Sequence, residues 1–178
     1  MRKVVAYELL SLDGVAEHPD AFITEFDEVM RENLGRVIAT QDTVLLGRRT
    51  YEDWAAFWPT SDIEPFAAFI NPVRKLVLTS TPLDPAWTNA TVVEGDLAEF
   101  VAELKAQPGG DIGVHGSIDL ARALLGLGLV DELRLVIAPA VQVQGRRLFD
   151  RGVPQHLSLT RSVTSPTGSL LVDYAARA

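Results

Sequence analysis

The sequence predicts an α/β fold, a three-layer domain in which helices flank a mostly parallel mixed sheet of about eight strands. Over roughly the first two thirds of the chain, short apolar runs alternate with segments of helical periodicity. The last third changes character, because residues 156–163 alternate apolar and polar side chains and a turn at residues 166–168 leads into a second such run. The sheet is therefore expected to end in an antiparallel C-terminal hairpin.

The expected elements follow one another in a single domain that covers residues 1–178. Strands are expected at residues 4–10, 43–46, 75–79, 90–93, 111–114, 132–138, 156–163 and 170–174. Residues 141–143 are a candidate continuation of the sixth strand past Pro139. Helices are expected at residues 22–38, 50–58, 97–104 and 118–125. Thr24 is the expected cap of the first helix, with Asp27 three residues later, and Pro59 ends the second helix.

The composition is that of a globular cytoplasmic protein. Of the 178 residues, 47% are apolar and 22% are charged, which permits a sizeable buried core. The net charge of −8 argues against nucleic acid and anionic membranes as partners, because phosphate surfaces require an excess of Lys and Arg. The apolar stretch at residues 4–10 is too short for a signal peptide or a membrane span, so a cytoplasmic location is expected.

Cysteine and histidine usage limits the chemistry that the chain can perform. The chain has no cysteine, which excludes disulfides, thiol catalysis and thiolate metal sites. The three histidines, His18, His115 and His156, lie far apart, and none shows the spacing of metal ligands. No metal site is predicted.

The turn Gly47-Arg48-Arg49-Thr50 is the most informative candidate site. Glycine after a strand lets the backbone turn tightly and approach a ligand. The N–H groups that follow open a helix and form an anion site, and two arginines add charge-assisted hydrogen bonds to phosphate. Taken alone, the motif is explained equally well as an ordinary turn with two solvated arginines.

Two further strand ends carry polar turns. Thr79-Ser80-Thr81 offers three hydroxyls to a nucleotide, although a hydroxyl-rich turn before Pro82 is the simpler explanation. His115-Gly116-Ser117 places a glycine and a candidate N-cap before a helix, whose first N–H groups suit a pyrophosphate, while His115 itself is more often a packed residue than a catalyst. Ligands of open α/β sheets bind beyond the carboxyl ends of the strands, where all these turns are expected.

Four residues are candidates for acid–base chemistry, namely Glu8, Asp13, Asp27 and His115. Glu8 lies in an apolar strand, where an unpaired charge is costly, so it either projects from the strand end or edge or faces a polar cleft. A structural role is favoured for Asp13, because turn aspartates commonly accept hydrogen bonds from their own backbone. Asp27 lies early in the first helix, where capping explains it equally well. The sequence shows no Ser/His/Asp triad and no Walker loop.

Several motifs together resemble the dihydrofolate reductase superfamily. They are Ser11-Leu12-Asp13-Gly14, Leu45-Leu46-Gly47-Arg48-Arg49-Thr50-Tyr51-Glu52, Leu129-Val130-Asp131-Glu132-Leu133-Arg134-Leu135, Pro139 and Gly145-Arg146-Arg147-Leu148-Phe149. The set occurs in order over nearly the whole chain. It resembles the branch related to the reductase domain of the riboflavin-biosynthesis deaminase-reductase, RibD, to which many stand-alone bacterial proteins belong.

The resemblance implies a dihydrofolate reductase-like fold that binds NADPH. It implies contacts to the adenosine-side phosphates and their pocket from Gly47, Arg48, Arg49, Thr50, Thr79, Ser80 and Thr81. It places the pyrophosphate at His115, Gly116, Ser117 and Ile118, and the nicotinamide beside Leu12, Gly14 and Val15. The two adjacent arginines fit a preference for the 2′-phosphate form of the cofactor.

The chain departs from the folate-reducing members of the superfamily at several places. It has His115-Gly116 where they carry two adjacent glycines, and it lacks the tryptophan of their mobile loop near Val15. Their helix acid that binds the pterin ring corresponds to Asp27 or Glu28, and Asp27 is the candidate catalytic residue. Without cysteine, the chain also lacks the zinc deaminase half of the riboflavin enzyme.

The leading hypothesis is an NADPH-dependent reductase that transfers hydride to a C=N or C=O bond of a small heterocyclic substrate. The substrate would be pterin-like or ribosylaminopyrimidine-like, as for the 5-amino-6-(5-phosphoribosylamino)uracil reductase of riboflavin biosynthesis. The alternatives are a non-catalytic NADPH-binding module and a true dihydrofolate reductase. Because relatives in this branch commonly pair, the resemblance also implies a homodimer.

Overall fold

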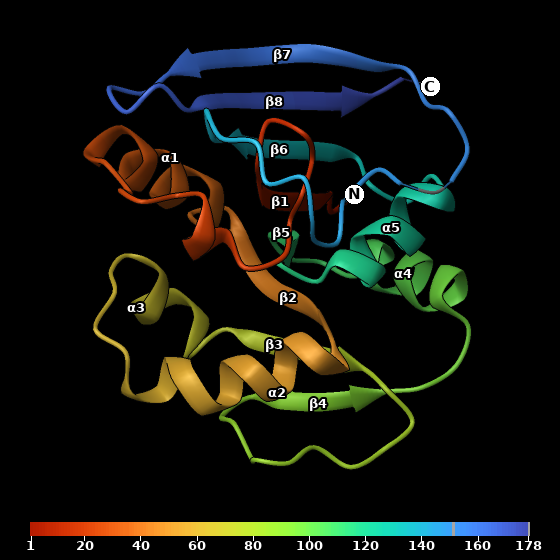
Figure 1. The fold of residues 1–178 in the computed structure, drawn as a ribbon. Coiled ribbons are helices and arrows are strands. Elements are labelled where there is room, and N and C mark those ends of the chain that lie inside the picture. Colours follow the sequence, from red (N-terminus) through yellow and green to blue (C-terminus); the bar gives the residue numbers. More distant parts are fainter. Residues whose placement is uncertain (151, 178) are drawn as a thin grey trace.

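The computed structural model describes residues 1–150 and 152–177, and it confirms the predicted α/β architecture. One sheet of eight strands runs through the molecule in the order β4-β3-β2-β5-β1-β6-β8-β7 (Figure 1). The strands are β1 (Val4–Leu10), β2 (Gln41–Gly47), β3 (Arg74–Leu78), β4 (Ala90–Val93), β5 (Asp111–His115), β6 (Glu132–Ile137), β7 (Leu157–Thr164) and β8 (Leu170–Ala176). Strands β1 to β6 are parallel, and β8 and β7 complete the sheet in antiparallel pairings.

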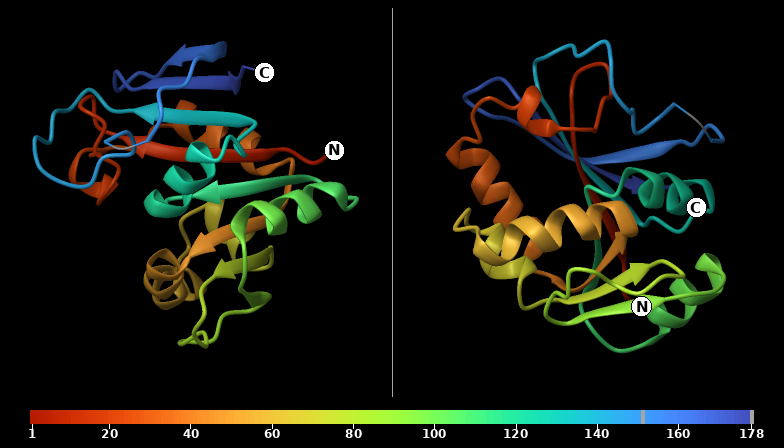
Figure 2. Two further views of the ribbon diagram at one scale, coloured as in Figure 1. Left: turned by 90° about the vertical axis from the view of Figure 1, so that its right-hand side faces the viewer. Right: turned by 60° about the horizontal axis from the view of Figure 1, so that its bottom comes forward.

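Helices cover both faces of the sheet (Figure 2). They are α1 (Glu28–Ile38), α2 (Arg48–Phe57), α3 (Phe66–Ile70), α4 (Leu97–Ala106) and α5 (Ile118–Gly126), with short 3-10 turns at η1 (Pro19–Ala21) and η2 (Trp58–Thr60). Helices α4 and α5 bury their apolar sides on one face, here called the α5 face. Helices α1, α2 and α3 do so on the other, the α1 face. No helix within residues 1–150 and 152–177 has both the length and the apolar character needed to cross a membrane.

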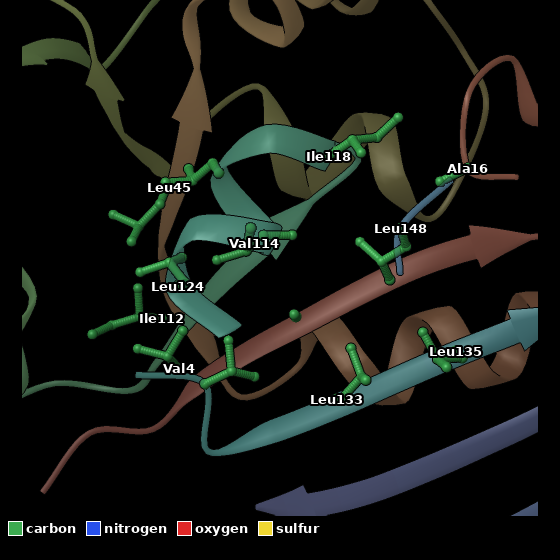
Figure 3. Packing of buried hydrophobic residues seen from close by; sticks show 14 of the residues in the cluster. Val4, Ala16, Leu45, Ile112, Val114, Ile118, Leu124, Leu133, Leu135 and Leu148 are labelled. Atoms are coloured by element: carbon green, nitrogen blue, oxygen red, sulfur yellow. The ribbon is translucent and has the colours of Figure 1, made fainter. Parts of the chain in front are cut away.

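Strand β1 lies in the middle of the sheet and contributes to both cores. Val4, Ala6 and Leu10 belong to the apolar cluster on the α5 face (Figure 3). Tyr7 packs into the cluster on the α1 face. Because successive side chains of a strand point to opposite faces, Glu8 lies on the α5 face between Ala6 and Leu10.

The first helix is shorter than the sequence predicted. Helix α1 begins at Glu28, and its N-cap is Asp27, whose Oδ1 accepts a hydrogen bond of 3.0 Å from the backbone N–H of Met30. The prediction of a helix from residue 22 with Thr24 as its cap is therefore wrong. Phe22 instead packs with Val15 and Ala138 in a small separate cluster, so its apolar side chain serves a loop contact.

Other boundaries also differ from the prediction. Helix α2 begins directly after Gly47, so Arg48 lies in its first turn, and helix α3 has no counterpart in the prediction. Residues 141–143 do not continue β6, which ends at Ile137. The N–H groups of Gln142 and Val143 instead donate to the Asp13 carboxylate at 2.9 Å each, an arrangement that a strand ladder would not allow.

Lys75 of β3 is completely buried. Its Nζ donates to the carbonyl oxygens of Ile70, Asn71 and Val73 at 2.8–2.9 Å, and it lies 4.4 Å from the ring centroid of Trp87. Burial lowers the pKa of Lys75 to about 8. The ammonium group therefore links the C-terminal end of α3 to β3 by hydrogen bonds.

Candidate functional site

The predicted turns after β2, β3 and β5 lie at one edge of the sheet, because these strands are neighbours and parallel. Hydrogen bonds join two of the turns directly. The backbone N–H of Gly47 donates to Ser117 Oγ at 3.1 Å, and Thr50 Oγ1 donates to the Gly116 carbonyl oxygen at 3.4 Å. The N-terminal turns of α2 and α5 therefore form one unit.

Arg48 connects this unit to the end of β3. Its Nε donates to Glu52 Oε1 at 2.6 Å, and its Nη1 donates to Thr79 Oγ1 at 3.4 Å and to the Pro82 carbonyl oxygen at 3.3 Å. Arg49 beside it is exposed. The guanidinium of Arg48 is thus held in place at the strand ends, which reduces the entropy lost when it binds an anion.

A pocket of about 340 Å³ lies at the ends of β3 and β4. Its lining mixes apolar and polar groups and consists of Leu78, Thr79, Ser80, Val93, Glu94, Gly95, Asp96, Leu97 and Phe100. The size is adequate for part of a small-molecule ligand. Sequence reasoning named Thr79 and Ser80 but missed Gly95 and Asp96. Their signal was present, because Gly95-Asp96 also follows a strand and precedes a helix, which Asp96 caps.

The loop after β1 is held by a dense set of hydrogen bonds. Ser11 Oγ accepts from the Val15 N–H at 3.0 Å and donates to Asp13 Oδ1 at 2.7 Å. Asp13 accepts from Gln142 N–H and lies 3.2 Å from Arg147 Nη2. The hydrogen bond from the Gln142 N–H, followed by those from Ser11 Oγ and the Val143 N–H, holds the pKa of Asp13 well below its usual range. Asp13 therefore joins the loop of residues 11–15 to the loop of residues 142–147.

The predicted nicotinamide-side residues in this loop differ in exposure. Leu12 is largely exposed, whereas Val15 is buried and forms an isolated antiparallel bridge with Arg147. Gly14 has a φ of 83°, a conformation that favours glycine. The loop follows β1, and the Gly116 turn follows β5. Because β1 and β5 are adjacent in the sheet, the loop and the turn are one strand apart along the same edge.

His115 directs its side chain to the α1 face. Its Nε2 lies 2.7 Å from Gln41 Oε1, and its ring centroid lies 5.3 Å from that of Phe66 and 5.7 Å from that of Tyr7. Burial lowers the pKa of His115 to about 3, so the imidazole is neutral at neutral pH. The backbone of His115 leads into the Gly116 turn, while its ring belongs to the core.

Asp27, the candidate catalytic residue, connects α1 to the turn between β7 and β8. Besides capping Met30, it accepts hydrogen bonds at Oδ2 from Thr167 Oγ1 at 2.8 Å and from Thr167 N–H at 3.2 Å. Burial acts to raise the pKa of Asp27, but these hydrogen bonds outweigh it and lower the pKa to about 2. The carboxylate thus has a structural role, and its catalytic role stays a prediction.

Glu8 is the acid whose environment the sequence left open. Glu8 is 2% exposed, and its Oε1 has no hydrogen-bond partner within the part of the chain that the structure describes. Burial raises the pKa of Glu8 to about 8. The strand-edge and polar-cleft interpretations are both wrong, because Glu8 occupies a central strand and its neighbours on the α5 face are apolar.

The geometry of this edge can be compared with known proteins. The family model of the RibD C-terminal domain matches residues 2–171. The chain belongs to the RibD C-terminal domain family. This membership confirms the resemblance drawn from the motifs and supports a reductase of the RibD type.

Three solved structures share the fold. A Shewanella sp. PV-4 protein, named only provisionally as a riboflavin biosynthesis protein, has a TM-score of 0.80 with 18% identity over 99% of each chain. The diaminohydroxyphosphoribosylaminopyrimidine deaminase/5-amino-6-(5-phosphoribosylamino)uracil reductase of Thermotoga maritima has a TM-score of 0.70 with 16% identity over 99% of this chain and 57% of that one. Enterococcus faecalis dihydrofolate reductase, complexed with NADP(H), has a TM-score of 0.64 with 16% identity over 99% of this chain and 97% of that one. The predicted dihydrofolate reductase-like fold is confirmed.

Proposed function

We propose that this chain is an NADPH-dependent reductase whose cofactor lies along the carboxyl edge of the sheet. The observation that carries the proposal is the junction of the α2 and α5 N-termini, made by the Gly47–Ser117 and Thr50–Gly116 hydrogen bonds. Helix N-termini present unpaired N–H groups and favour anions. Two of them, with the guanidinium of Arg48 beside them, suit the phosphates of a dinucleotide.

The strand order supports a direction for the cofactor along this edge. The pocket at β3 and β4 would take the adenosine, and Arg48 and Arg49 would contact its 2′-phosphate. The turn from Gly116 to Ile118, after β5, would hold the pyrophosphate. The loop of residues 11–15, after β1, would then lie beside the nicotinamide. This sequence of contacts follows the spatial order β4-β3-β2-β5-β1.

The proposed substrate is a small heterocycle with a reducible C=N or C=O bond. NADPH supplies the hydride when it is bound, and the chain orients cofactor and substrate. The α1 face offers partly exposed aromatic rings, those of Trp54, Trp58 and Phe69, close to the buried ring of Phe66. Such rings stack on planar heterocycles. They support a substrate site between β1 and α3.

A cofactor titration tests the proposal. We expect NADPH to bind more tightly than NADH, and Arg48→Ala to weaken NADPH by roughly 1–3 kcal/mol, as for the loss of a charge-assisted hydrogen bond, with little change for NADH. Arg31→Ala is the matched control, because Arg31 also forms an ion pair along a helix, with Glu28 at 3.1 Å, but lies on α1. A wild-type protein that binds no NADPH would overturn the proposal.

Turnover separates this function from its alternatives. NADPH absorbance would be followed with the ribosylaminopyrimidine substrate of the RibD reductase and, in parallel, with dihydrofolate. We expect oxidation of NADPH with the first compound and much slower oxidation with the second. The reverse ranking would identify a dihydrofolate reductase. Tight NADPH binding with no oxidation by either compound, or by related heterocycles, would favour a non-catalytic binding module.

A further inference from the structure

The pocket at the ends of β3 and β4 has an apolar lining beside a polar one. The apolar residues are partly buried and pack against the core on the α5 face, and they are Leu78, Val93, Leu97 and Phe100. Gly95 also lines the pocket, and no atom lies within 4 Å of the Cβ that a side chain would add there. A flat ring can therefore lie close to the backbone at Gly95 and contact the apolar residues.

The ends of β2, β3 and β4 are level with one another. Gly47 pairs with Leu78 in the ladder of β2 and β3, and Leu78 pairs with Val93 in the ladder of β3 and β4. The first residues beyond these strand ends are Arg48, Thr79 and Glu94. Because neighbouring strands are about 4.8 Å apart, the backbone positions of Arg48 and Glu94 are two spacings, roughly 10 Å, apart.

The two sides of the pocket carry opposite charges. On the side of β2, Arg48 Nη1 donates to Thr79 Oγ1 at 3.4 Å, and Thr79 lines the pocket. On the side of α4, the lining includes the acids Glu94 and Asp96. Asp96 is the N-cap of α4, and its Oδ1 accepts from two backbone N–H groups of the first helical turn at 2.9 Å each. Since Asp96 makes the cap, the exposed Glu94 is the acid left open to a ligand.

The polarity of this pocket matches that of an adenosine 2′-phosphate. The phosphate of this group is attached to the ribose, and the 6-amino group lies at the far end of the base. With the phosphate beside Arg48, the base would extend past the end of β3 toward β4, and its amino group would face Glu94. A carboxylate has only acceptors, so it binds an amino group and repels a carbonyl oxygen in the same place.

We propose that Glu94 selects the base of the cofactor by accepting a hydrogen bond from the 6-amino group of adenine. The contact makes the pocket specific for adenine against purines that carry a carbonyl oxygen at position 6. This inference rests on the proposed NADPH site and assigns it a specificity-determining residue. It also gives a role to an acid whose charge would otherwise only weaken the attraction of the pocket for the 2′-phosphate.

The test compares NADPH with its hypoxanthine analogue, in which a carbonyl oxygen replaces the 6-amino group. We expect the wild type to bind NADPH roughly 10-fold more tightly than the analogue, because the analogue loses a charge-assisted hydrogen bond. The amide of Glu94→Gln can both accept and donate, so this variant should bind the two ligands within about two-fold of each other. A ratio of affinities that the substitution leaves unchanged would overturn the inference.

Glu99→Gln is the matched control for this ratio. Glu99 is an exposed acid in the first turn of α4, but it does not line the pocket. Its substitution removes the same charge from the same neighbourhood, which changes the affinities for both anionic ligands alike, so the ratio should stay at the wild-type value. A ratio that falls equally in the Glu94 and Glu99 variants would show an effect of net charge and overturn the inference.

Two shorter ligands test the inference without any substitution. Adenosine 2′,5′-bisphosphate and inosine 2′,5′-bisphosphate lack the nicotinamide, and we expect the wild type to prefer the adenosine compound by the same ratio, because the contact lies at this end of the cofactor. If the wild type binds NADPH and its hypoxanthine analogue equally well, the inference fails while the proposed function stands. If the wild type binds neither, the proposed function fails and this inference with it.

Discussion

The two ends of the candidate cofactor edge are built on different principles. At the phosphate end, beyond β2 and β3, the polar groups are hydrogen-bonded and partly exposed, as Arg48 and Thr79 show. At the β1 end, the side chains of Glu8 and His115 are buried and largely uncharged at neutral pH, with Glu8 on one face of the sheet and His115 on the other. Charged ligand groups are suited to the first environment. An uncharged ring is suited to the second, where burial has removed the charge from the protein.

Glu8→Gln is expected to cause the largest change, in the pH dependence of stability. Burial raises the pKa of Glu8 from 4.5 to about 8, so the folded chain retains a proton that the unfolded chain releases. The wild-type free energy of unfolding therefore falls as pH rises from 4.5 to 8, by about 1.4 kcal/mol per pH unit from this group. In urea denaturation, the free energy of unfolding of the variant should rise relative to that of the wild type over this pH range, by a few kcal/mol in total. Glu25→Gln, at an exposed glutamate, should show no such gain.

His115→Gln is expected to act in the opposite sense. Burial lowers the pKa of His115 from 6.5 to about 3, so the unfolded chain takes up a proton that the folded chain excludes. Stability from this group is present above pH 6.5 and is lost as pH falls toward 3, again by about 1.4 kcal/mol per pH unit. Between pH 4.5 and 6.5 the contributions of Glu8 and His115 to the pH dependence of the free energy of unfolding nearly cancel in the wild type. There the stability of the His115 variant should fall with rising pH, and that of the Glu8 variant should rise; parallel profiles would contradict both assignments.

Ser117→Ala tests the phosphate end, with a smaller expected effect. The substitution removes the acceptor of the Gly47 N–H and is expected to lower the free energy of unfolding by about 1–2 kcal/mol. It should also weaken NADPH binding, because the two helix N-termini lose their direct connection. Ser162→Ala, at an exposed serine of β7, serves as the control. An unchanged NADPH affinity in the Ser117 variant would show that the junction does not organise the site.

Gly116→Ala is expected to have the smallest effect of the four. Gly116 has a φ of 61°, and an added Cβ would lie 3.0 Å from Trp54 Cζ2. The positive φ alone costs about 1 kcal/mol for alanine, so the melting temperature should drop by a few degrees. Gly126→Ala is the matched control, because no atom lies within 4 Å of its added Cβ. Equal melting temperatures for the two variants would show that the Gly116 turn relaxes without strain.

The turns beyond β2 and β5 were easier to predict from the sequence than the environment of Glu8, for a physical reason. The turns at Gly47 and Gly116 carry local signals, namely a glycine after a strand and a polar residue before a helix. Glu8 carried no such signal beyond its apolar neighbours, because its environment depends on β6, α5 and distant loops. The contacts of Asp27 with Thr167 likewise involve residues far apart in the sequence.

The errors within the fold have the same origin. The prediction of a helix from residue 22 counted Phe22 as part of a helical stripe, whereas it packs against Val15 and Ala138. Lys75 gave no sign in the sequence that it would be completely buried, because its partners are three backbone carbonyl groups. The order and type of the elements were predictable from periodicity. Contacts between distant segments were not.

The central place of β1 has a consequence for how the chain is made. Val4 lies beside Ile112 and Val5 beside Glu132, so β1 receives its two neighbours only after the whole segment up to β5 and β6 has been synthesised. Until then an apolar segment has no sheet to join, and contacts this distant in sequence form slowly. Nascent chains that end before β6 should therefore leave one side of β1 without a neighbouring strand, and the central sheet should form only after β6 has been synthesised.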